Sequence, residues 1–221
     1  MKNTTSAKKR SPGRPRSFDR QAALETAMKT FWAQGYETTS ISDLSRAMGI
    51  NAPAIYSAFG DKKQLFLEAM RLYLGDPQSQ AEAIAGAASA REAAAMVLAN
   101  AVRTFTGEDT PKGCLIGTGL ATGSPAAADV RAEGAATRAA LEALLTSRIE
   151  RDKTGGLLPV DTDAGTLAAL VSCTVQGFST LARDGAPAAR LQAIADFVLR
   201  GWPEIEGEGV DAEAVRRAGD S

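Results

Sequence analysis

The sequence predicts an all-α fold in which an N-terminal three-helix domain is joined through a fourth helix to a larger helical domain. Three observations support this prediction. Apolar residues recur at helical spacing along the chain, glycine and proline separate these stretches, and the alanine-rich segments beyond Pro77 show no alternation typical of strands. A chain of 221 residues is long enough for one small and one larger domain.

The first two helices are expected to begin at good N-cap residues. Asp19 precedes a stretch with apolar residues at helical spacing, and Gly35 ends that stretch. Ser40 and Asp43 have the spacing of a capping box before a short second helix, which Gly49 ends. Both segments are therefore expected to be short helices separated by a turn.

Two more helices are expected in the N-terminal third of the chain. Asn51 is a good N-cap for the third helix, and Pro53 stands in its first turn, where a missing N–H costs nothing. After Gly60-Asp61, the apolar residues between Leu65 and Tyr73 make one stripe of a fourth helix, which ends near Gly75.

The larger domain is expected to contain about five helices. Turn-rich segments around Gly107, Gly155-Gly156 and Gly185-Ala186-Pro187 separate them. The segment from Pro203 onward is rich in Gly, Glu and Asp, so we expect it to be a mobile tail. The expected helices span residues 79–88 or 90–106, 115–122, 125–151, 162–183 and 187–200.

The net charge of −1 conceals an asymmetry along the chain. Residues 1–74 carry twelve Lys/Arg and six Asp/Glu, whereas residues 75–221 carry thirteen and twenty. Residues 1–16 hold six basic side chains and no acidic one, which is typical of an arm that binds a polyanion, although a solvated, disordered tail has the same composition. Pro15 holds Arg14 and Arg16 in an extended segment suited to a narrow minor groove of DNA.

The composition argues against several classes of site. The chain has no histidine, which rules out triads with histidine, and no pair of acids or Ser/Lys arrangement has a catalytic spacing. We therefore expect no enzyme activity, no metal site and no cofactor. Cys114 and Cys173 lie far apart in the sequence and are expected to be reduced thiols. We find no membrane-spanning run or signal segment, so a cytoplasmic protein without a membrane partner is expected.

Residues 41–60 have the pattern of a helix-turn-helix. Ser45 is small enough to let two helices approach each other, and Gly49 tolerates the positive φ that a tight turn needs. Such a unit places its second helix in the major groove of DNA. A generic helical hairpin in a bundle core is the alternative interpretation. The apolar residues that would form the joint core are Leu44, Met48, Ile50 and Ile55.

The stretch from Phe18 to Tyr73 resembles the N-terminal domain of the TetR/AcrR family, over about a quarter of the chain. Ser57-Ala58 departs from the family pattern, which often has a bulkier aromatic residue or histidine there, so the operator sequence cannot be carried over. The matching residues are Ala27, Phe31-Trp32-Ala33-Gln34-Gly35-Tyr36, Thr39-Ser40-Ile41-Ser42-Asp43-Leu44, Met48-Gly49-Ile50, Ile55-Tyr56, Phe59, Asp61-Lys62 and Leu65-Phe66.

Seven residues of this stretch are candidates for contacts with DNA. Asn51, Ala52 and Ala54 begin the third helix and would read base edges, although an alanine contacts only a thymine methyl. Tyr56 resembles the family tyrosine that contacts DNA, with simple ring packing as the alternative. Lys62 matches the family's phosphate clamp at a helix N-terminus. Thr39 and Ser40 would add phosphate contacts or serve only as caps. The seven are Thr39, Ser40, Asn51, Ala52, Ala54, Tyr56 and Lys62.

The resemblance implies a dimer interface and a ligand cavity in the larger domain. Apolar stripes of the last two helices would form a four-helix interface across a two-fold axis, unless they are internal core. This interface would comprise Leu167, Leu170, Val171, Leu181, Leu191, Ile194 and Val198. Mainly apolar positions with a few hydroxyl groups would line the cavity, with ordinary core packing as the alternative for each. These are Phe105, Leu115, Thr118, Thr122, Val175 and Phe178.

The expected domains follow from these assignments. They are a basic arm (1–17), a helix-turn-helix DNA-binding domain (18–60), a connecting helix (61–75), a ligand-binding and dimerisation domain (76–202) and a mobile tail (203–221).

We expect a homodimeric TetR-type regulator, a repressor that a small, mostly apolar effector releases from a palindromic operator. One alternative is a redox or electrophile sensor that acts through Cys114, since the nearby Lys112 would favour the thiolate; a buried, inert thiol is the simpler interpretation of this residue. The other is a helical adaptor or enzyme that does not bind DNA.

Overall fold

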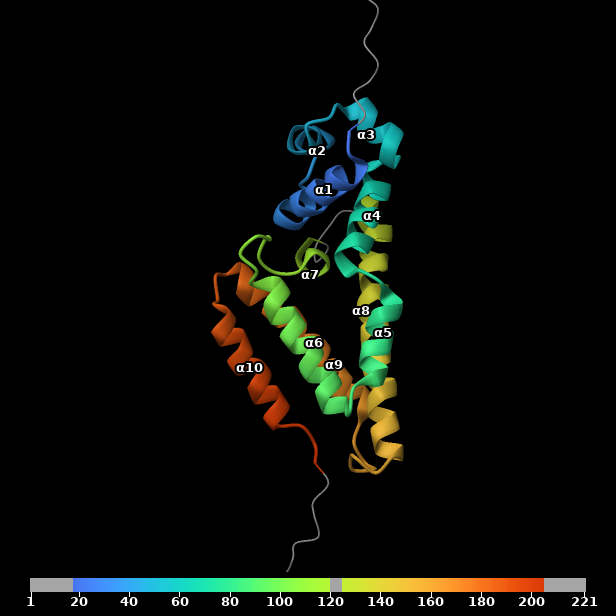
Figure 1. The fold of residues 1–221 in the computed structure, drawn as a ribbon, viewed down its shortest axis with the longest axis vertical. Helices are drawn as coiled ribbons and strands as arrows, with labels where there is room; N and C mark the ends of the chain where they lie inside the picture. Colours follow the sequence, from blue (N-terminus) through green and yellow to red (C-terminus); the bar gives the residue numbers. More distant parts are fainter. Residues whose placement is uncertain (1–17, 120–124, 205–221) are drawn as a thin grey trace, which may run out of the picture.

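The computed structural model describes residues 18–119 and 125–204, and this part of the chain is entirely helical. Figure 1 shows an elongated molecule with α2 and α3 at one end and the close of α10 toward the other. The helices are α1 (Arg20–Gln34), α2 (Ile41–Met48), α3 (Ala52–Phe59), α4 (Lys62–Leu74), α5 (Pro77–Gly86), α6 (Ala90–Phe105), α7 (Leu115–Gly119), α8 (Ala128–Thr154), α9 (Ala164–Arg183) and α10 (Ala188–Arg200), with a 3₁₀ turn, η1 (Pro125–Ala127), before α8.

The N-caps expected in the first three helices are confirmed. The Asp19 carboxylate accepts hydrogen bonds from two backbone N–H groups of α1. Ser40 and Asp43 form a complete capping box on α2, in which each side chain accepts from the other residue's backbone N–H. The side-chain oxygen of Asn51 accepts from the N–H of Ala54 in α3, and the Asp61 carboxylate accepts from the N–H of Gln64 in α4. Side-chain oxygens therefore satisfy N–H groups that have no partner within the helix.

The N-terminal core includes a helix from far along the sequence. Phe31 and Phe66 pack edge to face between α1 and α4, with ring centroids 5.1 Å apart. Leu115 and Ile116 of α7 are buried in this same core, together with Val130 of α8. The indole N–H of Trp32 donates to the carbonyl of Gly113, at 2.9 Å and out of contact with water. The start of α7 is therefore fixed against the C-terminal end of α1.

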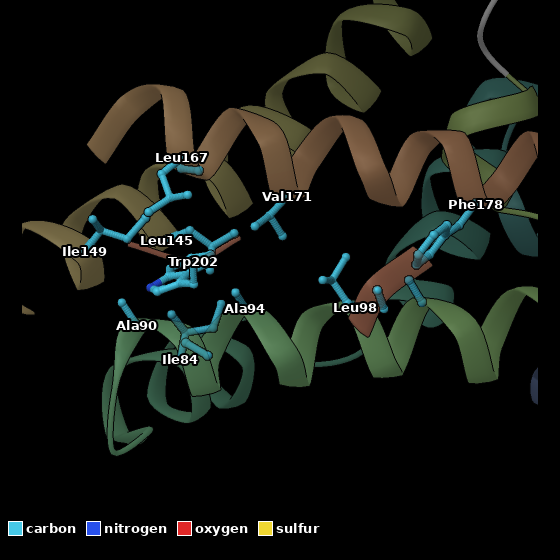
Figure 2. Close-up of a cluster of buried hydrophobic side chains, with 14 of the residues drawn as sticks. Ile84, Ala90, Ala94, Leu98, Leu145, Ile149, Leu167, Val171, Phe178 and Trp202 are labelled. Atoms are coloured by element: carbon cyan, nitrogen blue, oxygen red, sulfur yellow. The ribbon is translucent and has the colours of Figure 1, made fainter. Parts of the chain in front are cut away.

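A second core fills the space between α5, α6, α8, α9 and α10. Figure 2 shows Leu98 and Ala94 of α6 facing Leu145 of α8 and Val171 and Phe178 of α9, with Trp202 closing the cluster after α10. The sequence pattern predicted one helix over residues 79–88 or 90–106. Both segments are helical, because α5 ends before Ala87 and Ser89 caps the next helix, α6.

One helix in the described part of the chain, α9, is long and apolar enough to cross a membrane by length and composition. The expectation from the sequence was that no run is long and apolar enough to span a membrane. In the structure α9 packs against α6, α8 and α10, and Leu167, Val171 and Phe178 are buried in the second core. A core helix has the same composition as a membrane span, so this finding is weak evidence for a membrane segment.

A buried ion pair joins α8 to the corner between α5 and α6. Arg148 and Asp152 pair one helical turn apart, and their side chains are 5% and 3% exposed. The Asp152 carboxylate also accepts from the N–H of Ala90 at 2.6 Å, and the Arg148 guanidinium donates to the carbonyl of Ala87 at 3.1 Å. Each charge therefore compensates the other and satisfies backbone groups at a helix boundary.

Replacing Asp152 with alanine should lower the free energy of unfolding by about 3–5 kcal/mol, because it leaves the Arg148 charge buried without its partner. Glu150→Ala is the matched control on the same helix, since that carboxylate is 54% exposed and pairs only with Lys153. Glu150→Ala should lower the free energy of unfolding by less than about 1 kcal/mol. Urea unfolding followed by circular dichroism measures both, and equal losses for the two variants would contradict the interpretation.

Candidate nucleic-acid interface and effector cavity

The turn between α2 and α3 has the geometry of a helix-turn-helix. Gly49 adopts the left-handed conformation with φ of 68°, which a residue with a Cβ rarely adopts. The Ser45 hydroxyl donates to the carbonyl of Ile50 at 2.5 Å and so holds the turn against α2. Leu44 and Ile55 are fully buried where the two helices cross. The angle of α3 is therefore fixed by a small, closed core.

The outer face of α3 is exposed and polar. Tyr56 is 51% exposed, and Ser57 beside it is also exposed. Asn51 is exposed, and its side-chain oxygen accepts from the N–H of Ala54, which leaves the amide N–H groups facing outward. Ala52 and Ala54 are half-buried, so each presents only part of its surface. This face has the size and chemistry of a surface that enters a major groove.

Arg20 fixes α3 from behind, and the sequence analysis missed it. Its guanidinium donates to the carbonyl of Ala58 at 3.2 Å and to the Glu68 carboxylate at 2.7 Å, and it lies 4.4 Å from the centre of the Phe59 ring. Arg20 thus ties the start of α1 to the C-terminal end of α3 and to α4. No local pattern reveals this contact, because Arg20 and Ala58 are separated by 38 positions in the chain.

Lys62 lies in the first turn of α4, at the side of the helix-turn-helix. Its ammonium sits 4.6 Å from the centre of the Tyr36 ring and 3.4 Å from the carbonyl oxygen of Glu37. Desolvation by burial lowers the pKa of Lys62, and the charge of Glu37 opposes this shift. Burial also raises the pKa of the Tyr36 hydroxyl. The Tyr36 ring and the Glu37 carbonyl therefore hold the Lys62 ammonium against the turn that follows α1.

Thr39 does not present its side chain to DNA, which corrects the phosphate contact expected of it. The residue has no exposed surface, and its hydroxyl donates to the carbonyl of Gly35 at 2.6 Å. Its hydroxyl therefore closes the turn after α1. Ser40 is exposed, but its hydroxyl is engaged with Asp43 in the capping box. The Asp43 carboxylate accepts from the Ser40 hydroxyl and from the Ser40 backbone N–H, and these two bonds lower the pKa of the Asp43 carboxyl. Arg14 and Arg16 lie outside the described residues.

A cavity of about 180 Å³ opens between α4, α5, α6, α7, α8 and α9. Phe105 and Val175 line it, as expected from the sequence. Leu115 and Phe178 do not; each is fully buried, Leu115 in the N-terminal core and Phe178 in the C-terminal core, which corrects their assignment. The side chain of Thr118 and all of Thr122 lie outside the described residues.

Cys114 and Tyr73 meet in the wall of this cavity. The Tyr73 hydroxyl lies 3.5 Å from the sulfur of Cys114, and burial raises the pKa of that hydroxyl. The N–H of Cys114 donates to the Ser179 hydroxyl at 2.8 Å. Tyr73 also packs edge to face on Trp32, with ring centroids 4.8 Å apart. On its other side Tyr73 lines a wider cleft of about 400 Å³ between α1 and the loop after α6.

The expected dimer interface is only partly exposed in one protomer. Leu167, Val171 and Leu191 are buried in the protomer's own core, so they are not interface residues, because their side chains have almost no surface left for a partner. Leu170 is 46% exposed, and Phe197, which the sequence analysis missed, is 70% exposed. Leu181, Ile194 and Val198 are half-buried beside the core.

Within residues 18–119 and 125–204, no group of three or more His, Cys, Asp or Glu side chains is placed to hold a metal ion.

Comparison with known proteins agrees with the helix-turn-helix geometry. The model of the family described as bacterial regulatory proteins, tetR family, matches residues 23–69. The HTH-type transcriptional repressor ComR of Escherichia coli (strain K12) is 36% identical over 205 residues, which cover 92% of this chain and 98% of ComR. The repressor BdcR of the same strain is 30% identical over 127 residues, covering 57% of this chain and 64% of BdcR.

Solved structures with the same fold include regulators bound to DNA. A cysteine mutant of the TetR-family regulator CifR, in complex with 26-bp double-stranded operator DNA, is 40% identical, with a TM-score of 0.80 and coverage of 86% of this chain and 100% of that one. A TetR regulator from Rhodococcus sp. RHA1 is 37% identical, with a TM-score of 0.58 and coverage of 84% and 100%. These relatives are regulators rather than enzymes, and the chain belongs to the TetR family of DNA-binding transcriptional regulators.

Proposed function

We propose that the chain acts as a homodimeric repressor, which binds a palindromic operator and leaves it when a small effector occupies the cavity. The observation that carries this proposal is the exposed face of α3, with Tyr56 at its centre and Lys62 at its edge, on a core that Arg20 and Gly49 hold in place. Repression is the activity named for ComR and BdcR. A cytoplasmic location accords with binding to bacterial DNA.

Each subunit would insert α3 into one half-site. Tyr56 and the amide of Asn51 face outward from this helix and would contact bases or the adjoining sugar-phosphate backbone. The Lys62 ammonium and the free N–H groups of α4 would hold one phosphate. Arg14 and Arg16, in the basic arm, would reach the neighbouring minor groove. Phosphate contacts would supply affinity and α3 would supply sequence preference.

Dimerisation through α9 and α10 would set the spacing of the two α3 helices. Leu170 and Phe197 expose apolar surface on these adjacent helices, with the half-buried Leu181, Ile194 and Val198 between the exposed surface and the core. A two-fold axis through this face would bring four helices together and bury the exposed side chains.

The contacts of α7 give a physical route from the cavity to DNA. Cys114 and Ile116 line the cavity on one side, while Ile116 and Leu115 pack into the N-terminal core on the other. The Trp32–Gly113 hydrogen bond transmits a displacement of this segment to α1. Tyr73 and Leu74 of α4 line the same cavity. An occupant that shifts α7 or α4 would therefore change the separation of the two α3 helices.

Lys62→Ala and Tyr56→Ala should weaken operator binding in different ways. Lys62→Ala removes one phosphate contact, so it should weaken binding to operator and scrambled duplex alike and reduce the salt slope by about 1. Tyr56→Ala should weaken operator binding about tenfold, or about 1.4 kcal/mol. Its binding to scrambled duplex should weaken less than its binding to the operator. Fluorescence anisotropy at several salt concentrations, with DNA from upstream of the gene and with a selected random library, measures both.

Lys29→Ala is the control for these variants, because Lys29 is an exposed cation in the third turn of α1, outside the helix-turn-helix. Its operator binding should equal that of the wild type. If the wild-type protein shows no sequence preference on either DNA set, the repressor proposal is wrong and the adaptor interpretation replaces it.

Phe197→Asp should convert the dimer into monomers, since it places a charge in the middle of the proposed apolar interface. The variant should also lose operator affinity, because both half-sites need to be occupied at once. Val160→Asp is the matched control; Val160 is 87% exposed in the loop before α9. Light scattering after size exclusion gives the mass, and a dimeric Phe197→Asp protein would place the interface elsewhere.

A thiol-based response through Cys114 is a second candidate, favoured by the position of this residue in the cavity wall beside Tyr73. Addition of N-ethylmaleimide to the sulfur would enlarge the side chain and push α7 away from α9. Alkylation should then release the operator from the wild type and from Cys173→Ser, but not from Cys114→Ser, because Cys173 is exposed elsewhere on α9. Intact operator binding by stoichiometrically alkylated wild type refutes this candidate.

A further inference from the structure

The cavity has one charged group among the described residues that line it. This is the half-buried guanidinium of Arg138, from α8. Across the described part of the chain, no acidic side chain forms an ion pair with Arg138. The other polar side chains described in the lining are amides, hydroxyls and the Cys114 thiol. A guanidinium in such a wall favours an anionic occupant, because only an anion supplies the missing countercharge.

Asn100 adds a second donor group to the same wall. The Arg103 guanidinium, one turn along α6, donates to the side-chain oxygen of Asn100 at 2.7 Å. Since a guanidinium has no acceptor, this contact fixes which end of the amide faces Arg103. The two N–H groups of the Asn100 amide remain for an occupant. Arg138 of α8 and Asn100 of α6 therefore line the same cavity, and both side chains can donate to an oxygen of an anionic occupant.

Apolar side chains supply the hydrocarbon part of the lining, and the cavity itself is small. Val97, Phe105, Ile116, Leu141 and Val175 supply hydrocarbon surface from four helices. The cavity volume of about 180 Å³ slightly exceeds the roughly 150 Å³ of an apolar cavity that binds benzene. A single ring with one small substituent fills such a space, whereas a fused polycyclic ligand does not.

We propose that the effector is a monocyclic aromatic carboxylate, with its ring against Phe105 and Val175 and its carboxylate between Arg138 and Asn100. This proposal rests on the proposed function, since it names the ligand class of the same cavity. It also refines the expected mostly apolar effector: the apolar part is retained, and a single negative charge is added. A cationic ligand is disfavoured, because the described lining offers it no carboxylate.

Isothermal titration calorimetry on the full-length protein, without DNA, tests the ligand class. The three probes are benzoate, its neutral isostere benzamide and the cation benzylamine. Benzoate should bind at least about tenfold more tightly than benzamide, and benzylamine should not bind. Arg138→Gln should weaken benzoate binding about tenfold, to the level of benzamide, and leave benzamide binding unchanged.

Two further variants make the result specific. Arg190→Gln removes the same charge from an exposed position on α10 and should leave benzoate affinity unchanged. Arg138→Lys keeps the charge without the planar fork and should give an intermediate affinity. Thermal unfolding shows whether each variant is folded. Equal binding of benzoate and benzamide, an unchanged affinity in folded Arg138→Gln, or no binding of benzoate to the wild type overturns the proposal.

Operator anisotropy in the presence of benzoate separates this proposal from the proposed function. Benzoate that binds through Arg138 without weakening the operator complex supports the carboxylate site and contradicts its role in release. A protein that has no operator preference contradicts the repressor proposal, while the calorimetric comparison of the three probes still decides the ligand class.

Discussion

The attachment of α7 to α1 is the contact on which the rest of the arrangement depends. Leu115 and Ile116 of α7 join Val130 of α8 in a core whose other buried residues come from α1 to α4. The Trp32 indole has its hydrogen-bond partner in the chain just before α7. Breaking that bond while the indole stays buried costs about 1–3 kcal/mol, because the donor is left without an acceptor. The DNA-reading domain is therefore not closed by its own segment of the sequence, and its position follows that of α7.

The same dependence explains why the cavity lies where it does. Its walls come from α4 and α7, which belong to the N-terminal core, and from α5, α6, α8 and α9, which contribute to the C-terminal core. A ligand there contacts both cores at once, so its binding energy differs between two relative positions of the domains. Such a difference is the requirement for a ligand to shift a conformational equilibrium. A cavity wholly inside the second core would lack this property.

Local features of the fold were predictable from the sequence, and long-range contacts were not. The caps at Asp19 and Ser40 and the turn at Gly49 depend on residues a few positions apart, so their patterns are visible in the sequence. The contacts of Arg20 with Ala58 and of Trp32 with Gly113 join residues 38 and 81 positions apart, and no periodicity encodes them. Their geometry exists only once the helices have packed.

Helical periodicity also cannot say which side of an apolar helix faces the protomer's own core. The stripe on α9 was assigned to the dimer interface, yet Leu167 and Val171 point into the second core (Figure 2). Leu170 on the same helix is exposed. An apolar helix with two partners carries apolar residues on more than one face, so one stripe had two interpretations. The burial of each side chain decides between them. Thr39 is a similar case, because its hydroxyl suits both a phosphate and the Gly35 carbonyl.

Tyr73 lines both the cavity of about 180 Å³ and the cleft of about 400 Å³ beside Trp32. The Tyr73 ring therefore separates the cavity from the cleft. In a lineage where a smaller residue replaced it, the two spaces would become one, and larger molecules would enter without any change on the face of α3. The range of compounds that a regulator of this kind recognises would thus diverge by single steps in evolution, while the DNA sequence that it reads stays the same.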